Sequence, residues 1–232
     1  MVAELRRAAE EKGAPFHYAP DLADEAEIPA SFSLAGSFNR ENAVTAIAAL
    51  KTLGIAIDAA SFGRIVWPGR FQRVGDFLID GAHNPPAAKA LAEALRELFG
   101  SPAPRAMTLV FGACGDKDVE TVLCELAPFV RRAFAVRTNN PRSLVPEVLA
   151  AKMRATGLEA TPCGSLKEAL ENAGDDAPAS KTAGDDAPVS KTLPRVLVCG
   201  SLFLVGEALV ELGAAPWQSS RFDPSEHLAG NL

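Results

Sequence analysis

From Gly75 onward, the sequence alternates between short apolar runs and longer segments with helical periodicity. The apolar runs, which are typical of buried strands, cover residues 77–80, 107–113, 132–138, 158–162 and 195–201. The segments after them predict helices over residues 85–99, 119–130, 145–156, 166–172 and 202–212. Strands that alternate with helices form a mostly parallel sheet, covered on both faces and joined by right-handed crossovers. We therefore predict a doubly wound α/β domain over residues 67–232.

The first 66 residues lack this alternation. Residues 2–12 and 36–54 each predict a helix, and Gly54 is suited to end the second one. Residues 14–35 lie between them and are acidic and broken by proline, with only brief strand-like runs. Residues 55–66 predict a short helix or a linker. The change in pattern predicts a separate domain over residues 1–66.

A ten-residue repeat interrupts the second part of the chain. AGDDAPASKT at residues 173–182 is followed by AGDDAPVSKT at residues 183–192. The near-identity indicates a recent duplication. Its Gly, Asp, Pro and Ser content does not bury enough apolar area to order the segment. We expect a mobile surface loop there, between the 166–172 helix and the last strand.

Composition excludes several classes of function. The net charge of −6 disfavours a nucleic-acid partner, because such binding relies on cations that neutralise phosphates. No apolar run reaches the roughly 18 residues that a membrane span needs, and the charged first residues lack the apolar core of a signal peptide. The four cysteines form no C-x-x-C pair, and the three histidines show no metal-ligand spacing. These features predict a cytoplasmic protein with reduced cysteines and no metal ligands.

Residues 67–85, WPGRFQRVGDFLIDGAHNP, place several polar side chains around one strand end. The carboxyl ends of parallel strands are where α/β sheets bind ligands. Arg70, in a Pro-Gly turn, is interpreted either as a phosphate clamp or as a surface arginine. Asp80, at the strand end, either accepts ribose hydroxyls or forms an Asx turn. His83, just before a helix, either faces a bound anion or is a satisfied loop histidine.

Further candidates begin other helices or follow other strands. Lys117, in Gly-Asp-Lys-Asp, either shares the crevice or is an ordinary exposed lysine. Ser201 either holds a carboxylate or caps the last helix. Asn39 and Asn42, at the start of the 36–54 helix, either cap that helix or bind a ligand. Placement at successive strand ends favours one shared crevice for the later candidates. The sequence contains no G-x-x-x-x-G-K-[ST] P-loop motif.

Several of these segments together resemble a known family. WPGRFQ, DGAHNP, FGACGDKD and VCGSLFLVGE are similar to the C-terminal domain of folylpolyglutamate synthase and bifunctional dihydrofolate synthase. GSFNRENAVTAIAAL resembles the end of that family's central domain, a feature shared with the Mur ligases. In it, Phe38 and Asn39 replace a His-Gln pair that is frequent in the family. The resemblance implies that residues 1–66 are a remnant of the central domain and residues 67–232 the Rossmann-like glutamate ligase domain.

The resemblance also implies a reaction and roles. ATP phosphorylates a carboxylate of a folate, and the amine of glutamate then attacks the acyl phosphate. By matching positions, Asn42 contacts adenine, Arg70 the phosphates and Asp80 the ribose. His83 lies beside the phosphate and glutamate region, and Lys117 and Ser201 bind the incoming glutamate. The catalytic candidates are therefore His83 and Lys117.

The family also has parts that this sequence does not contain. Its P-loop ATPase domain and its ligands for Mg²⁺ precede the region of resemblance, so ATP and Mg²⁺ are implied cofactors and an N-terminal ATPase half is an implied partner. We expect the chain alone to be inactive. A non-catalytic nucleotide- or glutamate-binding module, or a remnant of the enzyme, is the alternative. A ligase for a Mur-type peptide precursor is a third interpretation, which DGAHNP disfavours.

Residues 1–66 should be less protected from hydrogen exchange than the later sheet. A domain that is present only in part leaves apolar surface without its partner layer, and such regions open at low free energy. Hydrogen-exchange mass spectrometry on the 232-residue chain measures this directly. Equal protection of residues 1–66 and of the sheet strands would contradict the expectation.

Overall fold

We describe a computed structural model of the chain, over residues 1–100, 105–176 and 193–216. The chain divides into two compact units, Met1–Val66 and Trp67–Leu232, which are described separately. Within the second unit, most of the predicted repeat loop, residues 177–192, lies outside the described residues. Its first four residues, 173–176, belong to a helix instead of a loop.

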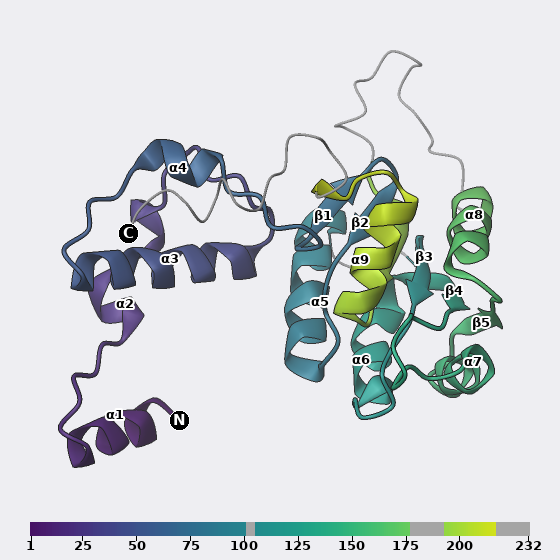
Figure 1. The fold of residues 1–232 in the computed structure, drawn as a ribbon, viewed down its shortest axis with the longest axis horizontal. Helices are drawn as coiled ribbons and strands as arrows, with labels where there is room; N and C mark the ends of the chain where they lie inside the picture. The colour runs from purple at the N-terminus through teal and green to yellow at the C-terminus, as the bar shows by residue number, and fades with distance from the viewer. Residues whose placement is uncertain (101–104, 177–192, 217–232) are drawn as a thin grey trace. The chain divides into compact units, whose positions relative to one another are not determined.

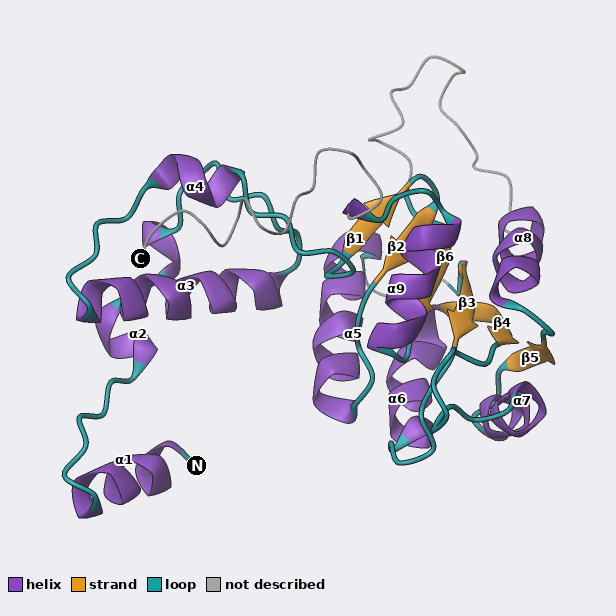
Figure 2. Cartoon of the chain, in the orientation of Figure 1, coloured by secondary structure: helices purple, strands orange, loops and turns teal. Residues whose placement is uncertain are grey.

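A six-stranded, mostly parallel sheet forms the centre of the second unit (Figure 2). Its strands are β1 (Gln72–Val74), β2 (Phe77–Ile79), β3 (Met107–Phe111), β4 (Val130–Ala135), β5 (Glu159–Pro162) and β6 (Val196–Cys199). The spatial order is β1-β2-β6-β3-β4-β5, and only β1 runs antiparallel to its neighbour. The predicted doubly wound α/β architecture is confirmed.

Helices cover both faces of the sheet (Figure 1). They are α5 (Pro85–Phe99), α6 (Val119–Leu126), α7 (Pro146–Ala155), α8 (Leu166–Asp176) and α9 (Leu202–Glu211). One buried cluster joins α5, α6 and α7 to the sheet, and the other joins α8 and α9 to the opposite face. Central strands β3 and β6 are buried along their whole length, as expected for strands covered on two sides.

The position of β6 creates a topological switch point. The chain moves outward through β2, β3, β4 and β5, and then returns to place β6 between β2 and β3. The loops after β2 and β3 lead to helices on one face, whereas the loop after β6 leads to α9 on the other. Diverging loops leave a crevice at the carboxyl ends of the strands. The topology therefore directs a ligand site to the ends of β2, β6 and β3.

Strand β1 and the end of α6 were not predicted. β1 pairs with β2 through a tight turn at Gly75, whose φ is +57°. After α6, the segment Ala127–Phe129 forms a 3-10 helix, and β4 begins at Val130. The prediction extended the helix to residue 130, but Pro128 has no N–H to continue the α-helical hydrogen bonds.

The first unit is helical. It contains α1 (Val2–Glu11), α2 (Ala19–Leu22), the 3-10 helix η1 (Glu25–Glu27), α3 (Ser37–Thr52) and α4 (Ala59–Gly63). Its buried core consists of Ala23, Ile28, Ala43, Ile47, Ala48 and Phe62. The strand-like runs predicted within residues 14–35 are wrong. A reciprocal capping box between Asp24 and Glu27 favours the helical turn η1 instead. No helix in the described part of the chain is long and apolar enough to cross a membrane.

The substitution Gly200→Ala should destabilise the sheet unit by about 2–4 kcal/mol. Gly200 has φ +109°, and an added Cβ would lie 2.6 Å from Phe111 Cε2 and 2.7 Å from the carbonyl oxygen of Gly112. Urea unfolding followed by circular dichroism measures the change. Gly206→Ala, inside α9 with no atom within 4 Å of the added Cβ, is the matched control. It should stabilise by about 0.5–1 kcal/mol, and equal effects of both substitutions would contradict the argument.

Candidate functional site

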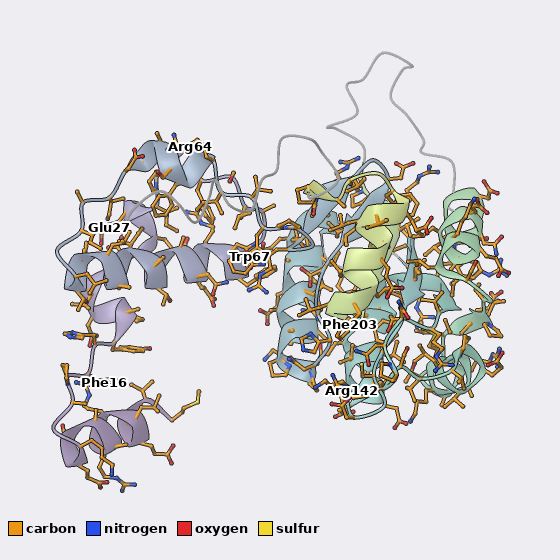
Figure 3. The ribbon with its side chains drawn as sticks, viewed as in Figure 1. Phe16, Glu27, Arg64, Trp67, Arg142 and Phe203 are labelled. Atoms are coloured by element: carbon orange, nitrogen blue, oxygen red, sulfur yellow. The ribbon has the colours of Figure 1, made fainter. Side chains whose placement is uncertain are left out.

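A cleft of about 190 Å³ lies at the switch point of the sheet. It is lined by His83, Cys114, Lys117, Arg142, Gly200, Ser201, Leu202 and Phe203. These residues come from the loops after β2, β3, β4 and β6 and from the start of α9. Figure 3 shows Phe203 and Arg142 at the same end of the second unit. The cleft thus unites three predicted site residues, His83, Lys117 and Ser201, and adds Cys114 and Arg142.

Ser201 begins α9 and is almost fully buried. Its Oγ accepts a hydrogen bond from the backbone N–H of Phe203 at 3.2 Å, so the residue is the N-cap of the helix. The neighbouring Gly200 N–H donates to the carbonyl oxygen of Ala82 at 2.8 Å. The start of α9 is therefore held against the DGAHNP loop. The hydroxyl proton of Ser201 is not used by the cap, so the side chain retains a donor.

The imidazole of His83 is oriented by its own loop. Nδ1 lies 2.8 Å from the carbonyl oxygen of Gly81. A carbonyl oxygen accepts only, so Nδ1 carries the proton and neutral His83 keeps its lone pair on Nε2. This contact satisfies one ring nitrogen, as expected of a loop histidine. It leaves Nε2 for a contact with a ligand in the cleft.

Two cations of the cleft share one carboxylate oxygen. Asp116 Oδ2 lies 3.2 Å from Lys117 Nζ and 3.6 Å from Arg142 Nη1. The bond from Lys117, with the smaller contributions of both positive charges, lowers the pKa of Asp116 below its usual value. Asp116 is therefore ionised at neutral pH. The three side chains together carry a net charge of about +1.

Arg142 was not predicted from the sequence. Its loop is fixed by several bonds: Arg142 N–H donates to Asn140 Oδ1 at 2.9 Å, and Gly115 N–H donates to the Arg142 carbonyl at 2.9 Å. Asn139 N–H also donates to Glu207 Oε1 of α9 at 2.8 Å. The available signal was an arginine in an Asn-Asn-Pro-Arg turn directly after the third predicted strand.

Asp80 directly follows β2 and holds two loops together. Its side chain is 5% exposed, Oδ2 accepts from Phe71 N–H at 2.9 Å, and Oδ1 accepts from Ala82 N–H at 2.8 Å. Burial raises the pKa of Asp80 and outweighs the lowering by these two amide bonds and by the charge of Arg70. This geometry matches the Asx-turn alternative. The ribose contact predicted for Asp80 and the phosphate contact predicted for exposed Arg70 stay predictions.

The asparagines have mainly local roles in the described residues. Asn84 Oδ1 accepts from Ala87 N–H at 2.9 Å and caps α5, which starts with two prolines. In the first unit, Asn39 is buried and its Nδ2 donates to the Ala35 carbonyl. Asn42 is exposed on α3, and its predicted adenine contact stays a prediction. No group of three His, Cys, Asp or Glu side chains suited to a metal occurs among the residues described.

Comparison with known families gives this cleft a context. The family profile described as "Mur ligase, glutamate ligase domain" matches residues 69–185, half of the chain. The chain belongs to the Mur ligase family. The match starts at the turn before β1 and includes the loops of His83, Lys117 and Arg142. In this Mur ligase domain, the matched segment thus supplies half of the eight residues that line the cleft at the strand ends.

Individual relatives of this Mur ligase domain include two kinds of enzyme. A probable bifunctional folylpolyglutamate synthase/dihydropteroate synthase of Halobacterium salinarum is 36% identical over 80% of the chain and 21% of the relative. A UDP-N-acetylmuramoyl-L-alanyl-D-glutamate–2,6-diaminopimelate ligase of Corynebacterium efficiens is 34% identical over 55% of the chain and 25% of the relative.

Solved structures agree with the family assignment. Mycobacterium tuberculosis folylpolyglutamate synthase, complexed with ADP and AMPPCP, aligns with TM-score 0.66 and 26% identity over 78% of the chain and 41% of the solved chain. The predicted resemblance to folylpolyglutamate synthase is confirmed. The chain spans between a fifth and two fifths of the length of these relatives.

Asp80→Asn should cost about 1–3 kcal/mol of unfolding free energy. An amide oxygen replaces only one of the two acceptors, so one partly or fully buried N–H, of Phe71 or Ala82, loses its partner. Asp118→Asn is the matched control, because Asp118 accepts a single backbone bond from Thr121 that asparagine also accepts. Urea unfolding measures both variants, and equal losses would contradict the two-acceptor argument.

The same variant tests the pH dependence. Because the pKa of Asp80 is raised in the folded chain, the folded state keeps a proton that the unfolded state releases near the usual value of 3.8. The contribution of Asp80 to the free energy of unfolding therefore falls as the pH rises from that value through its raised pKa. Stability curves of wild type and D80N across this range should differ in slope, and parallel curves would overturn the assignment.

Proposed function

We propose that the chain supplies the glutamate-binding part of an ATP-dependent amide ligase that lengthens a folate with glutamate. The observation that carries the proposal is the cleft in which Lys117, Arg142, His83 and Ser201 converge. The relatives support it, because the folylpolyglutamate synthase/dihydropteroate synthase relative aligns over more of the chain than the peptidoglycan-type ligase does. In this proposal, residues 1–66 form the end of the central domain of the full enzyme.

The charges of the cleft suit an amino-acid substrate. Lys117 and Arg142 provide ammonium and guanidinium donors for a carboxylate of glutamate, and the guanidinium offers a planar fork for two oxygens. The start of α9 adds the positive end of a helix dipole. Nε2 of His83 accepts a hydrogen bond from the α-amino group. These contacts place the amine and hold it for attack.

The proposed reaction forms one amide bond per ATP. A folate carboxylate oxygen attacks the γ-phosphorus of ATP, and the bond from that phosphorus to the β-γ bridging oxygen breaks to leave ADP and an acyl phosphate. The glutamate nitrogen then attacks the acyl carbon, the carbon–oxygen bond to phosphate breaks, and inorganic phosphate leaves. The nitrogen loses a proton, for which His83 Nε2 is the proposed acceptor. Lys117 stabilises the charge that develops on the departing phosphate.

Nucleotide contacts remain part of the proposal. Arg70 is exposed beside Asp80 and is proposed to contact the phosphates of ATP, with Asp80 at the ribose and Asn42 at adenine. The described residues do not gather a set of ligands for Mg²⁺. In the proposal, Mg²⁺ ligation therefore belongs to the remainder of the full enzyme.

Arg142→Gln should weaken L-glutamate binding to the chain by about tenfold, because a charge-assisted bond is lost from the cleft. Isothermal titration calorimetry with L-glutamate measures the dissociation constant. Lys89→Gln, which also removes one positive charge and lies exposed on α5, controls for net charge. Unchanged affinity in both R142Q and K117Q would contradict the proposal.

Turnover separates the ligase from a binding module. Labelled glutamate and ATP are supplied with a folate, first with the chain alone and then with the N-terminal region of a folylpolyglutamate synthase added. Incorporation that depends on the added region supports a ligase part. Glutamate binding without incorporation in either case would favour the alternative, a non-catalytic binding module.

A further inference from the structure

Asp116 occupies the position in which a bound carboxylate would bridge the two cations of the cleft. Its Oδ2 lies within 3.6 Å of both Lys117 Nζ and Arg142 Nη1, although Asp116 itself does not line the cleft. The contact is made by one oxygen of a side chain that is 46% exposed. Single ion pairs at such exposure contribute little to stability. The charge of Asp116 therefore matters more for what enters the cleft than for the fold.

We infer that Asp116 is a specificity-determining residue that favours the carboxylate of an amino acid over free phosphate dianions. The inference rests on the proposed function, in which this cleft binds glutamate. With Asp116 ionised, the cluster of Asp116, Lys117 and Arg142 has a net charge of +1, which one carboxylate neutralises. Without the carboxylate of Asp116, the two adjacent cations would carry a net charge of +2, which matches the charge of a phosphate dianion.

Exclusion of phosphate is a real demand on this cleft. The proposed reaction releases inorganic phosphate at the acyl carbon that glutamate attacks, so phosphate and glutamate meet the same cations in every cycle. Arginine and lysine are general phosphate binders, and nothing in their own chemistry favours a carboxylate. Selectivity then needs a repulsive element against the competitor, and Asp116 is the acidic side chain paired with both cations.

Neighbouring acidic groups are committed elsewhere. Asp118 accepts from Thr121 N–H and caps α6. Glu207 of α9 accepts from Asn139 N–H and holds the loop that carries Arg142. Asp80 is buried and accepts from two backbone amides. Each of these carboxylates supports a loop or a helix end, whereas the two ion pairs of the Asp116 side chain are with cleft cations.

The inference predicts a particular ratio of effects. A Coulomb energy is proportional to the charge of the ligand, so removal of one negative charge strengthens binding of a dianion by the square of the factor for a monoanion. We expect Asp116→Asn to tighten L-glutamate binding by about threefold and inorganic phosphate binding by about tenfold. Asparagine has nearly the same volume, so the shape of the loop is kept.

The test is calorimetric titration of the 232-residue chain with L-glutamate and, separately, with inorganic phosphate at pH 8, where phosphate is mainly dianionic. Wild type, D116N and the charge-matched control E93Q are compared, and added salt should reduce the D116N effect. A gain for phosphate at least twice the gain for glutamate, absent from E93Q, supports the inference.

Four other results overturn it. Weaker binding of both ligands by D116N would make Asp116 a positioning residue for Lys117 and Arg142. Equal gains in ligand affinity in D116N and E93Q would mean that the effect comes from the net charge of the chain and not from the position of Asp116. Unchanged phosphate affinity in D116N, with glutamate binding still weakened in R142Q, would remove the inference and leave the proposed function intact. No glutamate binding by wild type, together with unchanged phosphate binding in D116N, would remove both.

Discussion

The placement of β6 between β2 and β3 is the constraint on which the site depends. The loop after β6 leads to a helix on one face of the sheet, whereas the loops after its parallel neighbours β2 and β3 lead to helices on the other face. The loops therefore separate at the strand ends. The cleft forms there, and its lining residues come from four loops that are far apart in sequence. The hydrogen bond from Gly200 N–H to the carbonyl oxygen of Ala82 joins the loop after β6 to the loop after β2. A glycine is required at that point because only a residue without Cβ fits against Phe111 with φ at +109°.

Side chain to backbone hydrogen bonds help to hold the loops around the cleft. Asp80 joins the turn at Phe71 to the DGAHNP loop, and Ser143 and Asn140 close the loop that carries Arg142. The turn before β1 also packs tightly on α9, since a Cβ at Gly69 would lie 2.1 Å from Val205 Cγ1. Polar residues that the sequence places at strand ends thus perform two tasks. Some hold the backbone of a loop, and others present a charge to the cleft.

This division explains how much was predictable. Periodicity identified α5 to its exact residues and placed every buried parallel strand to within a few positions, because a two-sided sheet requires continuous apolar runs. His83, Lys117 and Ser201 were predicted as candidates because each lies between the end of a predicted strand and the helix that follows it. Arg142 was missed because its loop is longer, and its position depends on bonds to Asn140 and Gly115 that no local pattern encodes. Residue type alone also did not separate a ligand-binding Asp80 from an Asp80 that organises a turn.

Charge balance connects the fold of the cleft with its chemistry. A site that binds an anion needs cations that the protein has not fully neutralised. Two such cations side by side repel each other, and together they attract any anion nearby without selectivity. Here Lys117 and Arg142 come from different loops, and one carboxylate oxygen of Asp116 lies between them. The hydrogen bonds that fix the two loops bring the cations close, and Asp116 offsets the cost of that proximity. The same carboxylate is proposed to set which anion the cleft prefers, so it serves the selectivity of the site more than its stability.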